Sequence, residues 1–173
     1  MNRQWLFAIN SNCYIVRIII SGIGYLHCEM STKPPFLRIH VRAIAQATEV
    51  QERVGQAFIF ASGTEEIELE RTKGHFGNEI IIFKVELTKA SAMNKFLKQL
   101  KEAGILSQIK EQIEQRLDEE CTLYFRLDKQ KAYEEELALA ENTDVIAVMM
   151  KIAAYPARRE LALNVFLDWF KNF

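Results

Sequence analysis

The chain has 173 residues, of which 49% are hydrophobic and 26% charged, with only seven Gly and three Pro. This length and composition are typical of one ordinary globular domain, and they argue against a two-domain enzyme and against a disordered or disulfide-dense chain. Lys+Arg 22 against Asp+Glu 23 leave a formal net charge of -1. Bulk charge therefore does not indicate nucleic-acid binding, and any such site must come from local clustering of cations.

Residues 1–33 differ in character from the rest of the chain. Their longest apolar run without a charge, Ile18 to Leu26, is far shorter than the roughly 20 residues of a membrane helix. A secretory signal would need a compact positive end and a small-residue cleavage site, and neither pattern is clear. We interpret residues 1–33 as a poorly ordered extension, or as the product of a start site placed upstream of Met30. Membrane association is not expected.

Strong periodicity begins at residue 36. Residues 38–45 alternate apolar and basic, which predicts a half-buried strand with a basic outer stripe. Thr48 and Gln51 fit a capping box and predict a helix that ends near Gly63. Ile67 and Leu69 then alternate with glutamates in a second strand, and residues 79–87 predict a third. The Gly-rich linker 72–77 makes these two strands a hairpin.

The second half of the chain continues the pattern with four helices and two strands. The helical stripes that we predict to be buried are Met93, Phe96, Leu97 and Leu100, then Leu106, Ile109, Ile113 and Leu117, and finally Leu163, Phe166, Leu167 and Phe170. Gly104 is expected to end the first of these helices, Asp128 to cap a short one, and Pro156 to lie in the first turn of the last. The strands are expected over residues 121–127 and 144–154.

The predicted element order is therefore β-α-β-β-α-α-β-α-β-α, in one domain over residues 36–171. This order predicts an α+β fold, in which helices cover one face of a largely antiparallel sheet.

Catalytic and metal chemistry find no support in the residues. The three cysteines, Cys13, Cys28 and Cys121, are odd in number and widely spaced, which fits neither a disulfide framework nor a zinc site and indicates a reducing compartment such as the cytoplasm. The histidines share no ligand spacing, and there is no P-loop, dinucleotide-binding motif or nucleophile elbow. We therefore predict no catalytic residue, no metal and no cofactor.

The distribution of cations is more informative. If the strands alternate as predicted, one outer sheet face carries basic groups and a tyrosine, as a single-stranded RNA surface requires. These outward residues are Arg38, His40, Arg42, Lys84, Tyr124, Arg126 and Lys151. The alternative is that unburied strand positions simply take polar residues, and Glu68, Glu70 and Glu86 on nearby strands favour it.

Two further segments are candidates for RNA contact. The hairpin tip, residues 71–78, combines glycines with the donors Lys73, His75 and Asn78; the alternative is a hairpin turn that needs glycine for its geometry alone. The segment 155–160 places Arg158 and Arg159 near a helix N-terminus, whose free amides attract anions.

Four blocks of sequence, in this order and spacing, carry a resemblance to a known family. They are His40-Val-Arg-Ala with Ala47-Thr-Glu49, Thr72-Lys-Gly-His-Phe-Gly-Asn-Glu-Ile80, Tyr124-Phe-Arg-Leu-Asp-Lys-Gln130 and Tyr155-Pro-Ala-Arg-Arg-Glu160. The chain resembles, over residues 36–171, the archaeal family of RNA-binding proteins described as predicted exosome subunits. It departs from the family at residues 1–33, which have no counterpart, and at Glu79, where the family often has Pro.

The resemblance implies a non-catalytic protein with a ribosomal-protein-like fold, related in shape to double-stranded-RNA-binding modules, that acts as an accessory factor in RNA processing or degradation. An adaptor that docks on an RNA-processing assembly, such as the exosome, and touches little RNA stays the alternative. The candidate RNA-contacting residues are Arg38, His40, Arg42, Lys73, His75, Asn78, Lys84, Tyr124, Arg126, Lys129, Arg158 and Arg159. Oligomeric state and RNA type are not predicted.

Overall fold

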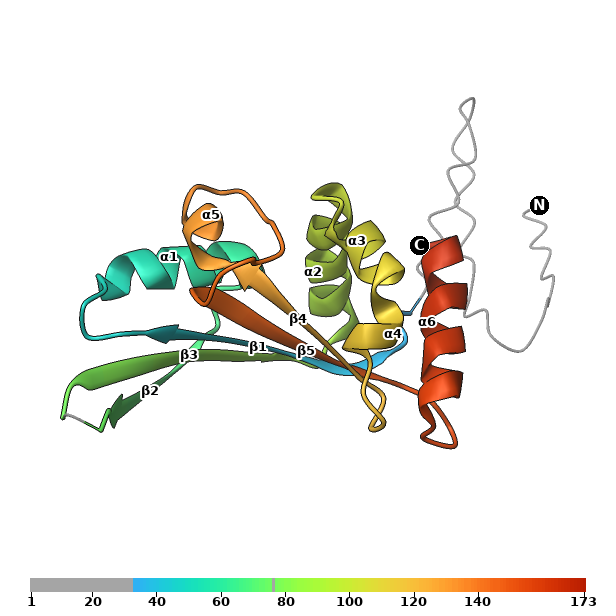
Figure 1. The fold of residues 1–173 in the computed structure, drawn as a ribbon. Helices are drawn as coiled ribbons and strands as arrows, with labels where there is room; N and C mark the ends of the chain where they lie inside the picture. Colours follow the sequence, from blue (N-terminus) through green and yellow to red (C-terminus); the bar gives the residue numbers. More distant parts are fainter. Residues whose placement is uncertain (1–32, 76) are drawn as a thin grey trace, which may run out of the picture.

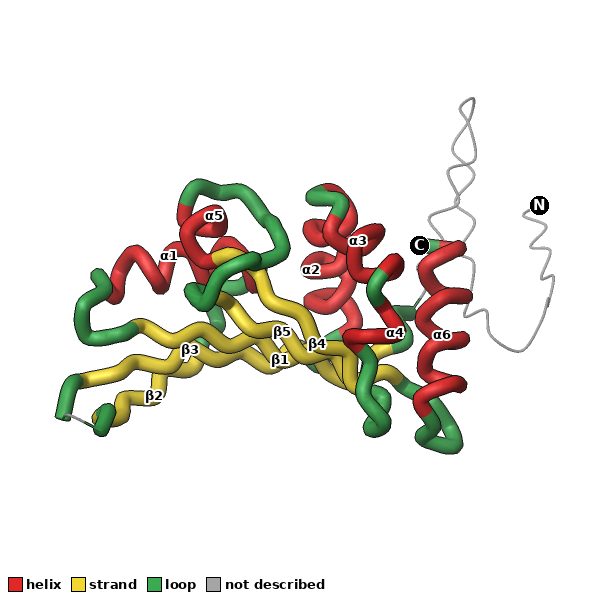
Figure 2. The backbone as a smooth tube through the Cα atoms, in the orientation of Figure 1, coloured by secondary structure: helices red, strands yellow, loops and turns green. Residues whose placement is uncertain are grey.

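The computed structural model describes residues 33–75 and 77–173, and the predictions for residues 1–32 lie outside the described residues. The described chain folds into one antiparallel sheet with the strand order β2-β3-β1-β5-β4, and its helices lie on one side of that sheet (Figures 1 and 2). The elements are β1(Phe36–Ala45), α1(Gln51–Ser62), β2(Glu68–Lys73), β3(Glu79–Leu87), α2(Ala90–Glu102), α3(Ile105–Glu111), α4(Ile113–Arg116), β4(Thr122–Asp128), α5(Lys129–Tyr133), β5(Val145–Ile152) and α6(Arg159–Asn172). The α+β class, the antiparallel sheet and the one-sided helix layer are confirmed.

The core lies between the sheet and the helices because strand alternation places apolar side chains on one face. In β1 the side chains of Ile39, Val41 and Ala43 are almost fully buried. Their register partners continue the same layer, since Val41 lies opposite Val85 of β3 and Val148 of β5. The inward stripe that the sequence predicted for the central strands is thus confirmed.

The helix α2 closes the layer with its predicted stripe. Met93, Phe96, Leu97 and Leu100 are buried to 2% exposure or less. The helix ends at Glu102 with Ala103 as its C-cap, and Gly104 follows with a φ of 71°, a left-handed conformation that glycine adopts without strain. The predicted stripe and the predicted end of this helix are both confirmed.

The start of α1 differs from the prediction. No side chain caps the helix: Val50 is the N-cap residue, its backbone is extended, and it is exposed. Thr48 therefore makes no capping box with Gln51. The Glu49 carboxylate instead accepts a hydrogen bond of 2.8 Å from the backbone N–H of Gln46. This hydrogen bond joins the two ends of the short loop between β1 and α1.

Two other helices also differ. The single helix that was predicted to follow Gly104 is divided at Gln112 into α3 and α4. Leu117 lies beyond the end of α4 and forms an isolated β-bridge with Leu123 of β4. In α6 the buried residues are Ala162, Phe166 and Trp169, because the helix turns Trp169 toward Phe36 of β1, with the two ring centroids 5.3 Å apart. The predicted stripe shares Phe166 with this set, and its other members, Leu163, Leu167 and Phe170, are half-buried and pack against the core. The predicted place of Pro156 in the first turn is also wrong, since α6 starts at Arg159.

The strand β2 extends past the layer of helices. The sequence predicted that Ile67 and Leu69 alternate with glutamates in this strand. Ile67, just before β2, is half-buried and packs against the core, whereas all six residues of β2 are exposed, with Leu69 at 56%. The reason is visible in Figure 1, where α1 lies over β1 and β3 while β2 occupies the outer edge. The hairpin is confirmed as a hairpin, but its first strand contributes nothing to the core.

Within residues 33–75 and 77–173, no helix is long and apolar enough to cross a membrane.

Candidate nucleic-acid interface

The face of the sheet opposite the helices carries aligned rows of side chains. The strand register fixes these rows, since Arg42 of β1 lies opposite Lys84 of β3 on one side and Ala147 of β5 on the other. Ala147 in turn lies opposite Arg126 of β4. Three cations from three strands therefore share one line across the sheet, which we call the basic row: Arg126, Arg42 and Lys84.

A second row holds the aromatic group. Tyr124 of β4 lies opposite Met149 of β5, and Met149 lies opposite His40 of β1. A third row, nearer the start of β1, pairs Arg38 with Lys151. The structure thus brings together the candidates of the sheet face, which the sequence had placed there by alternation alone.

Some of these cations are neutralised by carboxylates on the same face. Lys84 forms an ion pair with Glu70, and His40 Nε2 lies 3.5 Å from a Glu86 carboxylate oxygen. The hydrogen bond from Lys84, its charge and, more weakly, the charge of Arg42 hold the pKa of Glu70 below its ordinary value. The carboxylate therefore stays ionised at neutral pH.

The arginines of the face remain available. Within the described part of the chain, Arg38, Arg42 and Arg126 form no ion pair, and all three side chains are exposed. Exposed guanidinium groups present planar sets of donors that match phosphate oxygens. The alternative, that unburied strand positions simply take polar residues, is therefore supported only in part. The glutamates of this face lie beside His40 and Lys84, and they form no ion pair with these three arginines.

Tyr124 offers an exposed ring beside these cations, since 44% of the residue is accessible. Partial burial, followed by a hydrogen bond to the Asp118 carboxylate, raises the pKa of Tyr124. The phenol is therefore neutral at physiological pH and does not repel phosphate. A neutral aromatic ring on an open sheet provides a surface on which a base can stack.

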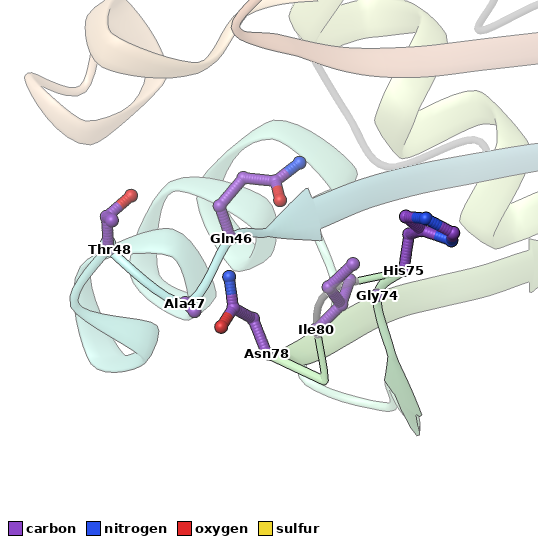
Figure 3. Close-up of a pocket in the computed structure, with 7 residues that line it drawn as sticks. All are labelled: Gln46, Ala47, Thr48, Gly74, His75, Asn78 and Ile80. Carbon is purple, nitrogen blue, oxygen red and sulfur yellow. The ribbon is translucent and has the colours of Figure 1, made fainter.

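The hairpin tip forms one wall of a hollow at the end of the sheet (Figure 3). The other wall is the loop after β1, and the hollow has a volume of about 330 Å³. Its lining residues are Gln46, Ala47, Thr48, Gly74, His75, Asn78 and Ile80. A Cβ at Gly74 would lie 3.2 Å from Ile80 Cδ1, so glycine permits the close approach of the tip to β3.

A wider depression of about 660 Å³ adjoins this hollow and shares Gln46 and Thr48 with it. Its lining includes Arg42 of the basic row, Gln130 of α5 and Asp144 before β5. We call the two together the end basin. Three of the four sequence blocks that carry the family resemblance meet around it, namely residues 40–49, 72–80 and 124–130.

Lys129 is placed differently from the prediction that it contacts RNA. Only 5% of its side chain is accessible, and its ammonium pairs with Glu49 at 2.8 Å and with Asp144. It also donates a hydrogen bond of 3.0 Å to the carbonyl of Ile44. A buried, fully paired ammonium does not reach a ligand phosphate, so Lys129 joins β1, the loop after it and the segment before β5.

Arg158 and Arg159 lie at the opposite end of the sheet from the basin, because they follow the carboxyl end of β5. The Arg159 guanidinium forms hydrogen bonds within the protein. Its Nε donates to the Leu117 carbonyl at 3.1 Å, and a terminal nitrogen donates to the Glu114 carbonyl. Arg158 is exposed and precedes the first turn of α6. The structure therefore separates this pair from Lys73 and His75, and only Arg158 keeps a free side chain.

Sequence reasoning missed the polar residues of the loop after β1. Gln46 and Thr48 line both depressions, yet neither was a candidate. The sequence pattern at Thr48 predicts a helix cap, and this interpretation does not suggest a binding role for Thr48. The position of residues 47–49 within a family block was the signal that could have found the loop.

Comparison with known proteins identifies the family of this chain. A family model described as "RNA binding" matches residues 38–152. The chain belongs to this RNA-binding family. The RNA-binding protein PAB1135 of Pyrococcus abyssi is 34% identical over 145 residues, which cover 78% of this chain and 93% of that protein.

Two solved structures of similar sequence have the same fold as this chain. A DUF54 protein from Archaeoglobus fulgidus is similar with a TM-score of 0.68 and 37% identity, covering 77% of this chain and 98% of its own. A DUF54 protein from Methanothermobacter thermautotrophicus has a TM-score of 0.64 and 29% identity, with coverage of 77% and 96%. The α+β fold of this RNA-binding family is thereby shown, while the kinship in shape with double-stranded-RNA-binding modules stays a prediction.

Among residues 33–75 and 77–173, no three His, Cys, Asp or Glu side chains cluster in a way that could hold a metal ion. Cys121 is a free, buried thiol at the start of β4.

Proposed function

We propose that this protein binds RNA on the face of its sheet opposite the helices, with the arginines of β1 and β4 contacting the phosphate backbone. The observation that carries the proposal is the basic row, in which strand register aligns Arg126, Arg42 and Lys84 across the face. Arg38 adds a further cation in a neighbouring row, and Lys73 adds another at the end of β2. Membership of the RNA-binding family supports this assignment.

The proposed contacts are mainly electrostatic, with one aromatic exception. Phosphate contacts position an RNA without reading its sequence, so the arginines bind different sequences about equally. Tyr124 stacks on an exposed base, while His40, His75 and Asn78 offer hydrogen bonds at the edges of the surface. Arg158 reaches only an RNA that extends past the start of β1.

In the cell, we propose an accessory and non-catalytic role in RNA processing or degradation, alongside the exosome or a related ribonucleoprotein. Support for this role comes from the family resemblance of the four sequence blocks. The adaptor alternative differs in its salt dependence, because a protein interface built on apolar contacts does not release the counterions that RNA binding releases.

The decisive experiment compares two double variants at two salt concentrations. Arg42→Ala/Arg126→Ala removes two cations from the proposed face, and Arg53→Ala/Arg116→Ala removes an exposed and a half-buried arginine from the helices. We expect only the first variant to weaken binding of labelled RNA and to reduce the salt slope, by about one for each lost phosphate contact. Equal effects of the two variants, or no RNA binding by the wild type, would reject the proposal.

A further inference from the structure

The end basin differs from the basic row in its charge. The hollow beside the hairpin tip is lined by polar and apolar groups, with no Lys, Arg, Asp or Glu among its described lining residues. In the adjoining depression, the cations Arg42 and Lys129 balance the carboxylates of Glu49 and Asp144. A phosphate gains little in such a place, whereas a neutral group with hydrogen-bonding edges suits it.

Two amide side chains in the basin have their hydrogen-bonding capacity free. Within the described residues, the side-chain amides of Gln46 and Asn78 donate and accept no hydrogen bond, and both residues are exposed. By contrast, the Gln130 amide already donates to Asp144 at 2.6 Å. An amide presents a donor and an acceptor side by side, which is the pattern needed to pair with the edge of a nucleobase.

The walls of the hollow also provide an apolar surface and a suitable size. Ile80 and Ala47 contribute apolar contact, and Gly74 lets the tip come close enough to enclose the space from one side. A volume of about 330 Å³ falls within the range of sites for small ligands, roughly 300–1,000 Å³. The basin borders Arg42, so a base held there stays joined to a backbone that lies on the basic row.

We propose that the end basin receives one unstacked nucleobase of the bound RNA, with Gln46 and Asn78 contacting its edge. A base within a regular duplex is stacked between its neighbours and cannot enter a hollow, so the preferred RNA carries a bulged, looped or terminal nucleotide. This inference rests on the proposed function and names the class of RNA that the same surface prefers.

The test uses a short RNA duplex with a single bulged uridine and a second duplex whose bulge lacks the base. The two probes share the same backbone and charge, so the basic row binds them equally. We expect the wild type to bind the bulged uridine about tenfold more tightly, the affinity that one good base-edge contact supplies. Gln46→Ala/Asn78→Ala should abolish this preference and leave affinity for the base-free probe unchanged.

The control is Gln108→Ala/Gln115→Ala, which removes two exposed amides from α3 and α4 and should keep the preference. Crosslinking from a thiouridine at the bulge gives a second readout, expected within residues 46–48 or 74–80. Equal affinity of the wild type for the two probes, or a preference that survives in Gln46→Ala/Asn78→Ala, would overturn the inference while the proposed function stands. Loss of all RNA binding in the wild type would overturn both.

Discussion

Arg42 of β1 and Lys84 of β3 are cross-strand partners, two cations opposite each other on the sheet face that lies opposite the helices. Like charges in this arrangement oppose each other, and Glu70 neutralises Lys84 but, among the described residues, leaves Arg42 without an ion pair, so stability alone does not explain Arg42. An anionic ligand would remove the repulsion. This relationship therefore points to binding as the reason for the residues, and it yields the first prediction.

We predict that Arg42→Thr separates stability from binding. Threonine is a good strand former and relieves the repulsion at Lys84, so the free energy of unfolding should stay within about 0.5 kcal/mol of the wild type. RNA affinity should fall and the salt slope should decrease by about one. Denaturant unfolding and fluorescence anisotropy measure the two quantities, and a destabilised variant with normal RNA affinity would contradict the prediction.

Glu70→Gln should have the opposite effect on RNA binding. The substitution removes the partner of Lys84 and one negative charge from the face, so RNA affinity should rise and the salt slope should steepen by about one. Lowering the pH to 5 should not reproduce this gain. The pKa of Glu70 lies below its ordinary value of 4.5, so the carboxylate is still ionised at pH 5. The Glu70–Lys84 ion pair therefore contributes to stability above pH 4.5, and this contribution is lost only as the pH falls through the lowered pKa of Glu70.

Two substitutions at Tyr124 distinguish the ring from the hydroxyl. Tyr124→Phe keeps the aromatic surface and loses the hydrogen bond to Asp118, and it should retain RNA affinity. Tyr124→Leu removes the ring and should cost about 1–3 kcal/mol of binding if a base stacks there. Binding titrations with single-stranded RNA measure both, and equal affinities for the two variants would exclude stacking.

Lys129→Met tests the buried ammonium. The change leaves Glu49 and Asp144 without their partner, but these side chains keep 23% and 32% accessibility. We therefore expect a loss of about 2 kcal/mol in unfolding free energy, below the roughly 3–5 kcal/mol of a fully enclosed pair. Adding Glu49→Gln and Asp144→Asn should restore most of that loss. Lys131→Met, at an exposed position of the same helix, should be neutral.

A chain that begins at Met30 should fold as cooperatively as the full chain. The buried core found among the described residues starts at Phe36, and its members pack within the segment from there to Phe173. Thermal unfolding followed by circular dichroism would compare the two chains. A transition that is lost or much broadened in the shorter chain would show that residues 1–29 contribute to stability.

The extent of sequence prediction differed between strands and helices. Strand alternation identified the inward and outward sides of β1, β3 and β4 because a period of two leaves little ambiguity about the face. In α6 the sequence predicted one stripe, Leu163, Phe166, Leu167 and Phe170, whereas the most deeply buried residues are Ala162, Phe166 and Trp169. Local spacing did not reveal this rotation of the helix, because it depends on the tertiary contact between Trp169 and Phe36.

The site was predictable only where it depends on alternation. The sheet-face cations followed from β1 and β4, whereas the burial of Lys129 depends on Glu49 and Asp144, which lie far from it in sequence. Asp128 shows a local prediction that succeeded, because its carboxylate accepts hydrogen bonds from the backbone N–H groups of Gln130 and Lys131. The end basin needed the fold, since it joins the hairpin tip to the loop after β1.

The full exposure of β2 has a consequence for the dynamics of the sheet. A strand that buries no side chain opens at low free energy, so its amide hydrogens should exchange with solvent well before those of β1 and β5. The basin therefore has two unlike walls. The wall formed by the loop after β1 is held in place by the ion pairs of Lys129. The wall formed by the hairpin tip opens more easily, so we expect this wall to change its conformation when a nucleotide binds.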